Sequence, residues 1–79
     1  MAKQIVVLDR GFVYVGNVED QGENLKITEA RNIRRWGTTK GLGQLALEGP
    51  TRNTELDDVG TVIAPKRAVI HQIECKQDW

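Results

Sequence analysis

Apolar residues recur in a two-residue period in residues 12–18, FVYVGNV. Such a period is typical of a β-strand that presents different side chains on its two faces. A β-branched run at residues 5–8 precedes this stretch, and polar segments containing Gly11 and Gly22 flank it. Because glycine takes positive φ without steric cost, both segments are predicted to reverse the chain between strands. The first third of the chain is therefore predicted to be antiparallel β-structure.

A third strand is predicted to begin at Leu25, but the sequence leaves its end open. The spacing of Ala30, Ile33 and Trp36 breaks the two-residue period, which indicates a bulge or a turn of helix. The strand therefore ends at Glu29 or continues to Trp36. If it continues as a regular strand, Arg34 and Trp36 point one way, and the other direction is taken by Arg31, Ile33 and Arg35.

Residues 41–49, GLGQLALEG, are predicted to form a short helix of two turns. The segment ends at a glycine followed by a proline, which is typical of a helix C-terminus. Thr38 and Thr39 precede it as candidate N-cap residues. The residues at helical spacing, which we expect to face the core, are Leu42, Leu45 and Ala46.

The remaining segments complete a mainly β chain. Residues 50–60 are predicted to be a polar loop, and strands are predicted at 61–65 and 67–76. This order predicts a small, strongly bent antiparallel sheet or partly open barrel of about five strands. One short helix lies between strands three and four, and residues 1–79 form a single domain.

A domain of 79 residues buries only about 60% of the surface that its unfolded chain exposes. Small domains compensate with disulfides, a structural metal or self-association. One cysteine and one histidine exclude an intrachain disulfide and leave no metal cluster, so no metal site and no cofactor are expected. Self-association into a homo-oligomer is the remaining means of stabilisation.

The 11 basic and 11 acidic residues balance, so the chain lacks the overall charge of a protein that coats DNA or RNA. Strong nucleic-acid binding is therefore not expected, and any anion binding must be local. No apolar run approaches the roughly 20 residues that span a bilayer, and the N-terminal apolar patch is too short for a signal peptide. We expect a soluble protein of a reducing cytoplasm, with no membrane partner.

Residues 30–51 hold a local surplus of positive charge. Four basic residues and no acid lie between residues 30 and 45, whereas residues 48–58 hold four acids and one arginine. Guanidinium groups bind phosphates, a tryptophan ring can stack on a base, and a helix N-terminus offers free N–H groups to an anion. The segment therefore predicts a ligand site made of Arg34, Arg35, Trp36, Thr38, Thr39, Lys40 and Gly41. Tyr14 is an alternative stacking ring, and Arg52 belongs to a polar segment, residues 49–54, that could close over the ligand.

The same segment also has a structural interpretation. In that interpretation Trp36 fills the core, the arginines form a solvated strand edge or pair with the acidic stretch, and the glycines serve turns and caps. The glycine spacing is not that of a P-loop, because no Gly-Lys-Ser/Thr follows. For the segment 49–54, a plain polar loop is the favoured interpretation over one that closes on a ligand. The question for the structure is whether Trp36 faces the core or a ligand.

His71 and Cys75 lie four residues apart in the last predicted strand, on one face. A metal would need two further ligands, so buried strand residues are the favoured interpretation. No sequence context brings His71 together with Asp57 or Asp58 and a hydroxyl as a catalytic set, and we do not expect an enzyme. The terminal Trp79 either packs into a neighbouring subunit or frays.

Two resemblances accompany these patterns. Residues 6–30 are similar to the first three strands of Sm-like barrels, in which a glycine of the second strand, here Gly16, permits the bend. This resemblance implies assembly through edge strands. Over residues 5–75 the chain resembles a family of small hypothetical proteins of phages and prophages. The carrying motifs are VYVGNV, LKITEARNIRRW, GLGQLALEGPT and VIHQIEC.

The phage resemblance implies action in the host cytoplasm and one of the roles open to phage proteins of this size. Our first hypothesis is a non-enzymatic anti-defence sponge, an oligomer that sequesters a nucleotide immune signal such as a cyclic dinucleotide. The alternative is an interaction module, either a virion accessory subunit or a protein that docks on a host protein. A third possibility is weak binding of single-stranded nucleic acid by an Sm-like ring.

Overall fold

The computed structural model describes residues 3–76. Within this range the chain forms five strands, one α-helix and two short 3-10 helices. In chain order these are β1 (Lys3–Leu8), η1 (Asp9–Gly11), β2 (Val13–Asp20), β3 (Asn24–Arg35), α1 (Leu42–Glu48), β4 (Glu55–Pro65), η2 (Lys66–Ala68) and β5 (Val69–Glu74). The terminal Trp79 lies outside the described residues.

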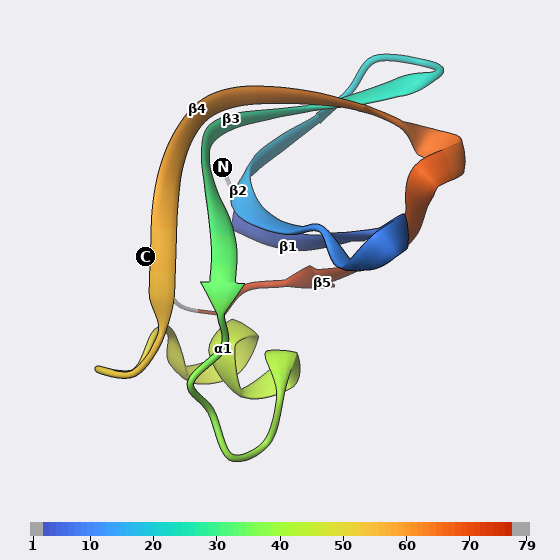
Figure 1. Cartoon of the computed structure of the whole chain (residues 1–79). Helices are drawn as coiled ribbons and strands as arrows, with labels where there is room; N and C mark the ends of the chain where they lie inside the picture. The colour runs from blue at the N-terminus through green and yellow to red at the C-terminus, as the bar shows by residue number, and fades with distance from the viewer. Residues whose placement is uncertain (1–2, 77–79) are drawn as a thin grey trace.

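The five strands form one antiparallel sheet in the order β4-β3-β2-β1-β5. Figure 1 shows the sheet curling so that β3 and β4 arch over β1, β2 and β5, with β4 and β5 left as its two edges. The sheet is not closed. The predicted fold class, a mainly β, strongly bent antiparallel sheet with one helix between the third and fourth strands, is confirmed.

The two predicted reversals lie where the glycines indicated them. Gly11 and Gly22 have φ values of 82° and 81°, which a glycine adopts without strain. At the second reversal, the backbone N–H of Gly22 donates a 2.9 Å hydrogen bond to a carboxylate oxygen of Asp20. These short connections keep β1, β2 and β3 adjacent in the sheet.

β2 and β3 approach each other closely at Gly16, next to an irregularity in their pairing. A Cβ atom at Gly16 would lie 2.7 Å from Ile27 Cγ2 and 2.8 Å from the carbonyl oxygen of Thr28, so only glycine fits there. Opposite it, β3 carries a bulge in which Glu29 has a φ of 50°. The third strand continues past this bulge to Arg35, which resolves the boundary that the sequence left open.

The sheet buries apolar side chains on both faces. One cluster lies between the sheet and α1. It consists of Ile5, Val13, Val15 and Ile33 from the sheet and Leu42, Leu45 and Ala46 from the helix. The other lies on the concave side of the bend and consists of Val6, Leu8, Leu25, Ile27, Ala30 and Ala64. The three helix residues predicted to face the core are therefore all buried. Neighbouring residues of β1 belong to different clusters, as the alternation of side chains along a strand requires.

Two local predictions are wrong. β4 begins at Glu55, so residues 55–60, predicted as loop, are part of a strand. The acidic side chains there can pair with basic residues of β3, which compensates for their low β-propensity. The N-cap of α1 is Gly41, with no side-chain cap hydrogen bond, because the Thr38 hydroxyl donates instead to the Gly41 carbonyl at 2.9 Å.

The interpretation of His71 as a buried residue is also wrong. Its side chain is exposed, because β5 is an edge strand that other elements cover only in part. Cys75 is half-buried and packs against the cluster beneath α1. Among the described residues no group of three or more His, Cys, Asp or Glu side chains could hold a metal ion.

No helix of the described chain has the length and apolar character needed to cross a bilayer.

Candidate functional site

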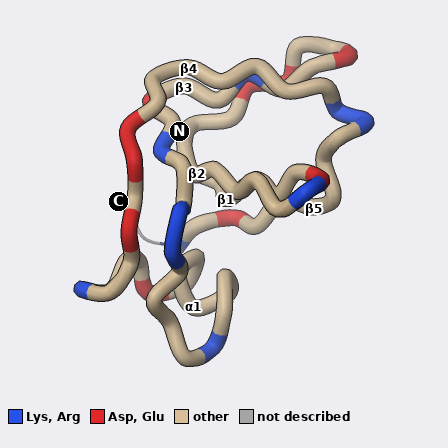
Figure 2. Tube along the Cα trace, viewed as in Figure 1, with Lys and Arg blue, Asp and Glu red and all other residues tan. Residues whose placement is uncertain are grey.

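The basic end of β3 lies beside the acidic start of β4. Figure 2 shows a basic stretch of β3 beside an acidic stretch of β4, and the pairing of the two strands sets Arg35 opposite Glu55. Arg34 forms ion pairs with Glu55 (Nη2 to Oε1, 3.2 Å) and Asp57 (Nε to Oδ2, 3.1 Å). Arg35 pairs with the other oxygen of Glu55 (Nη1 to Oε2, 3.6 Å). The interpretation of the arginines as partners of the acidic stretch is thus confirmed.

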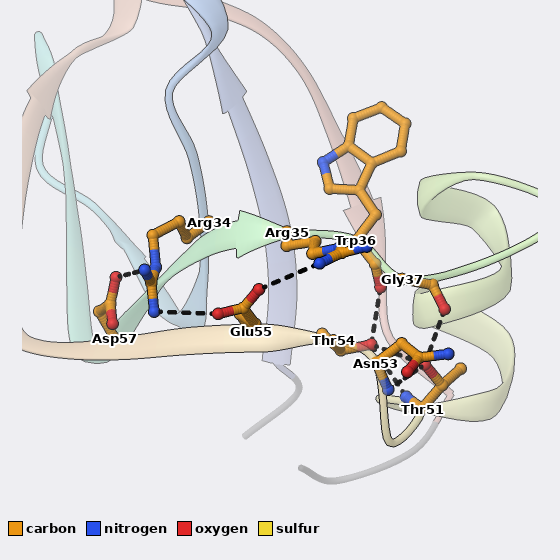
Figure 3. A network of polar contacts seen from close by, with 9 residues as sticks. All are labelled: Arg34, Arg35, Trp36, Gly37, Thr51, Asn53, Thr54, Glu55 and Asp57. Atoms are coloured by element: carbon orange, nitrogen blue, oxygen red, sulfur yellow. Dashed lines mark hydrogen bonds and ion pairs between the residues drawn. The ribbon is translucent and has the colours of Figure 1, made fainter.

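Arg34 and Arg35 do not separate as a regular strand would require. The register between β3 and β4 shifts between Ile33 and Arg35, so both guanidinium groups reach Glu55 (Figure 3). The condition of a regular strand, on which the predicted side-chain directions depend, is therefore not met at this end of β3. Two positive and two negative charges cancel in this ion-pair cluster of Arg34, Arg35, Glu55 and Asp57.

The ion-pair cluster is exposed to water. The side chains of Arg34 and Arg35 are 61% and 69% exposed, and Glu55 is 44% exposed. Exposed ion pairs contribute about 0–1 kcal/mol each, because water screens them and the side chains lose conformational freedom. An external partner can therefore replace one of these ion pairs at little cost in free energy. An anion that binds the arginines, however, must compete with the carboxylates of Glu55 and Asp57.

Trp36 follows the cluster directly and is 44% exposed. It belongs to neither apolar cluster of the core. Figure 3 shows the indole projecting from the end of β3, away from the loop that contains Thr54. One edge of the ring lies near the backbone of Gly41, since a Cβ at that glycine would be 3.9 Å from Trp36 Cζ3. The flat ring thus has one edge beside Gly41 and is open on the surface.

The loop after α1 clamps the chain just past Trp36. The hydroxyl of Thr51 donates to the Gly37 carbonyl and that of Thr54 to the Trp36 carbonyl, both at 2.7 Å. The fit is close, because a Cβ on Gly37 would lie 2.3 Å from the Asn53 carbonyl carbon. These hydroxyls are therefore engaged in holding the exit of β3, which favours the structural interpretation of residues 49–54.

The loop between β3 and α1 is also internally bonded. The Thr39 hydroxyl and the Lys40 backbone N–H both donate to the side-chain oxygen of Gln44, at 3.3 and 3.0 Å. With Thr38 bonded to Gly41, both threonine hydroxyls have partners within the loop. Within residues 3–76 the side chains of Lys40 and Arg52 form no ion pair. They are charges of the two loops beside the end of β3 that a ligand could take without displacing a carboxylate.

Tyr14, the alternative stacking ring, is half-buried and packs against the apolar cluster of the concave face. It serves the core, whereas Trp36 is open. The structure thus brings the ends of β3 and β4, Trp36 and the two loops together at one end of the molecule. The predicted ligand site omitted Glu55 and Asp57, which the structure places beside its arginines. The acidic stretch that follows the basic one in the sequence could have indicated them.

Two hollows of the described surface lie elsewhere. One, of about 430 Å³, lies between the β2–β3 reversal and η2, and the other, of about 340 Å³, lies at the bulge of β3. They are lined by Glu23, Asn24, Pro65, Lys66 and Arg67, and by Lys3, Glu29, Ala30, Arg31, Asp58 and Gly60. Neither contains a residue of the predicted ligand site, which is therefore a surface and not one of these concavities.

A scan against protein-family models gives no match for this chain, and a search of curated proteins finds no significant match either. The resemblances to phage proteins and to Sm-like barrels therefore stay predictions.

Proposed function

We propose that this protein is a non-enzymatic interaction module that docks on a protein partner through the surface around Trp36. The observation that carries the proposal is the open indole beside an exposed and internally neutralised cluster of arginines and carboxylates. Tryptophan and arginine are enriched among the residues that dominate protein–protein binding energies. Charge pairs at the rim of such a surface add specificity more than affinity.

The shape of the surface supports a macromolecular partner. Small-molecule sites are concave and bury most of the ligand, whereas Trp36 stands out from the end of β3. A mixed-charge surface also suits a protein better than a polyanion, since Glu55 and Asp57 repel phosphates while they offer acceptors to a partner's basic side chains.

A site-specific photo-crosslinking experiment tests this function. A benzoylphenylalanine residue replaces Trp36 in one variant and Phe12 in a matched control, because Phe12 is 54% exposed at a different part of the surface. We expect a protein adduct from the variant at position 36, formed in lysate treated with nuclease and phosphatase, and none from the control. Equal adducts at both positions, or none at position 36, would contradict the proposal.

Trp36→Ala and Phe12→Ala quantify the same point. Loss of a tryptophan anchor of about 2 kcal/mol or more weakens affinity for the captured partner about thirtyfold. Phe12→Ala is expected to leave that affinity unchanged. Both variants are checked by circular dichroism for an intact fold.

A second candidate function is the anti-defence sponge for a nucleotide signal. One specific observation favours it: Lys40 and Arg52 carry charges without ion-pair partners in the described chain, in the two loops that border Trp36. A second subunit would have to enclose the base, because the indole is open in the monomer.

Calorimetry with a panel of cyclic nucleotides distinguishes the two candidates. The sponge predicts binding that both Trp36→Ala and Lys40→Ala abolish, whereas the interaction module predicts that Lys40→Ala leaves protein binding intact. Dissociation constants weaker than about 1 mM for the whole panel, a free energy of only about 4 kcal/mol, would rule out the sponge.

A further inference from the structure

The two arginines of the ion-pair cluster are not bound equally well. Arg34 makes two contacts of hydrogen-bond length, from Nη2 to Glu55 at 3.2 Å and from Nε to Asp57 at 3.1 Å. Arg35 makes one contact, from Nη1 to Glu55, and its length of 3.6 Å exceeds that of a hydrogen bond. Arg34 is therefore fixed between two carboxylates, whereas the described chain gives the Arg35 guanidinium no acceptor at hydrogen-bond distance.

The charges of the cluster alternate along the ends of β3 and β4. The contacts form a charge row in the order Asp57, Arg34, Glu55 and Arg35. Figure 3 shows Arg34 approaching Glu55 from the Asp57 side and Arg35 approaching it from the Trp36 side. Each inner member of the charge row contacts two opposite charges, but Arg35 contacts one. The charge row therefore ends on a guanidinium whose neighbour in the chain is the open indole.

A single guanidinium can bind two carboxylates, because its five N–H donors point outward in one plane. Arg34 does so here, between Glu55 and Asp57. Arg35 is 69% exposed, so a carboxylate from outside can reach it. Such a carboxylate would continue the alternation of charges without displacing Glu55.

We propose that the partner of the Trp36 surface presents an aspartate or glutamate side chain that pairs with Arg35, at the rim of the apolar pocket that receives the indole. This inference rests on the function proposed above and names the chemistry of the partner. An arginine–carboxylate pair has a defined, often bidentate geometry, and a charge pair at the rim of an interface adds specificity more than affinity. Arg35 thus determines which partners fit, and Trp36 supplies the affinity.

The charge of the surroundings favours an acidic partner. Lys40 and Arg52, in the two loops beside the end of β3, form no ion pair within the described chain, so they add positive charge next to a neutral cluster. A carboxylate suits Arg35 better than a phosphate does. A phosphate monoester carries a charge of about −1.5 to −2 at pH 7 and would be repelled more strongly by Glu55, which contacts the same guanidinium.

The variant with benzoylphenylalanine at position 36 tests the pair. The probe is the protein that this variant captures from lysate treated with nuclease and phosphatase, and the yield of the adduct is measured after further substitutions. We expect Arg35→Ala to lower the yield about tenfold, because a hydrogen-bonded charge pair is lost. Arg35→Lys retains the charge and should lower it less. Arg52→Ala is the matched control and should change it by less than about twofold, since Arg52 lies outside the charge row.

The outcomes distinguish this inference from the function on which it rests. The absence of any adduct at position 36 before the further substitutions overturns both. A strong adduct whose yield is the same with Arg35→Ala overturns the acidic partner and leaves the docking function standing. Equal losses for Arg35→Ala and Arg52→Ala also overturn it, because they indicate general attraction by positive charge. Circular dichroism of each variant checks that the fold is intact.

Exchange of charges between the two proteins gives a second measurement. Mass spectrometry of the adduct locates the cross-linked segment of the captured protein, and each acidic residue there is changed to lysine. We expect Arg35→Glu to weaken binding about tenfold or more, and one of the lysine variants to restore it. Losses that simply add for every combination would contradict a direct pair, because residues in contact are coupled.

Discussion

The two faces of the sheet are buried by different means. On one face, Ile5 and Val15 are covered by α1, which contributes Leu45. On the other face, Val6 and Ile27 are covered by the sheet itself, which bends until Ala64 of β4 joins the same cluster. A small chain can thus bury both faces of one sheet without a second sheet, provided that it has an inserted helix and a backbone that permits a sharp bend.

The helix-covered face is expected to be the more sensitive to a single truncation. Leu45 is fully buried, so Leu45→Ala removes buried methylene groups and leaves a cavity, at a cost of roughly 3 kcal/mol in the free energy of unfolding. Urea unfolding followed by circular dichroism measures this loss. Leu47→Ala, on the exposed side of the same helix, should change the free energy by less than about 0.5 kcal/mol.

The bent face is expected to be destabilised by added side-chain volume, whereas the helix-covered face is destabilised by its removal. Gly16→Ala places a methyl group within 2.8 Å of a backbone oxygen, and a backbone atom cannot move aside as a flexible side chain can. We expect a destabilisation of roughly 2 kcal/mol in the same urea experiment. A Gly16→Ala protein as stable as wild type would show that the close approach of β2 and β3 does not require glycine at this position.

A glycine on the helix provides the matched contrast. A Cβ at Gly43 would meet nothing within 4 Å, and the residue lies inside α1. Gly43→Ala should therefore stabilise the protein by about 0.5–1 kcal/mol, because alanine loses less conformational entropy in a helix. If the free energy of unfolding falls in Gly16→Ala and rises in Gly43→Ala, then glycine is sterically required at position 16 and only tolerated at position 43.

The smallest effect is expected at the far end of the bend, where Lys66 of η2 pairs with Asp20 at 2.6 Å. The hydrogen bond from Lys66, and then that from the Gly22 N–H, lower the pKa of Asp20 below its ordinary value of 3.8. A carboxyl whose folded pKa is lowered stabilises the fold above its unfolded pKa and loses that contribution as the pH falls through the folded value.

Asp20→Asn should therefore be slightly less stable than wild type at neutral pH and equal to it at a pH well below 3.8. Thermal unfolding at the two pH values measures the difference. A gap that persists unchanged in acid would mean that the ionised carboxylate does not contribute.

Much of the fold could be predicted from the sequence. The strand alternation, the glycine reversals and the helical spacing of Leu42, Leu45 and Ala46 are local patterns with local causes, and the structure has all three. The start of β4 could not be predicted, because Glu55 and Asp57 have low β-propensity. They lie in a strand because β3 provides backbone hydrogen-bond partners for the ladder and Arg34 as the ion-pair partner of their carboxylates.

The candidate site was predictable as a segment but not as an arrangement. The sequence places Arg34, Arg35 and Trp36 next to one another, but it does not say which side chains a bulged strand turns to the same neighbour. The register shift after Ile33 brings both arginines to Glu55, and the clamp by Thr51 and Thr54 holds the chain so that the indole stays open.

The sequence by itself determined that this protein is a small, bent β-sheet with one helix, because the periodicity of apolar residues and the turns depend on neighbouring residues. Only the tertiary structure decided that the basic segment is neutralised by β4 and that Trp36 lies on the surface. Those outcomes depend on contacts between residues about 20 positions apart, such as Arg34 with Glu55, whose geometry is fixed by strand register and by the bend at Gly16.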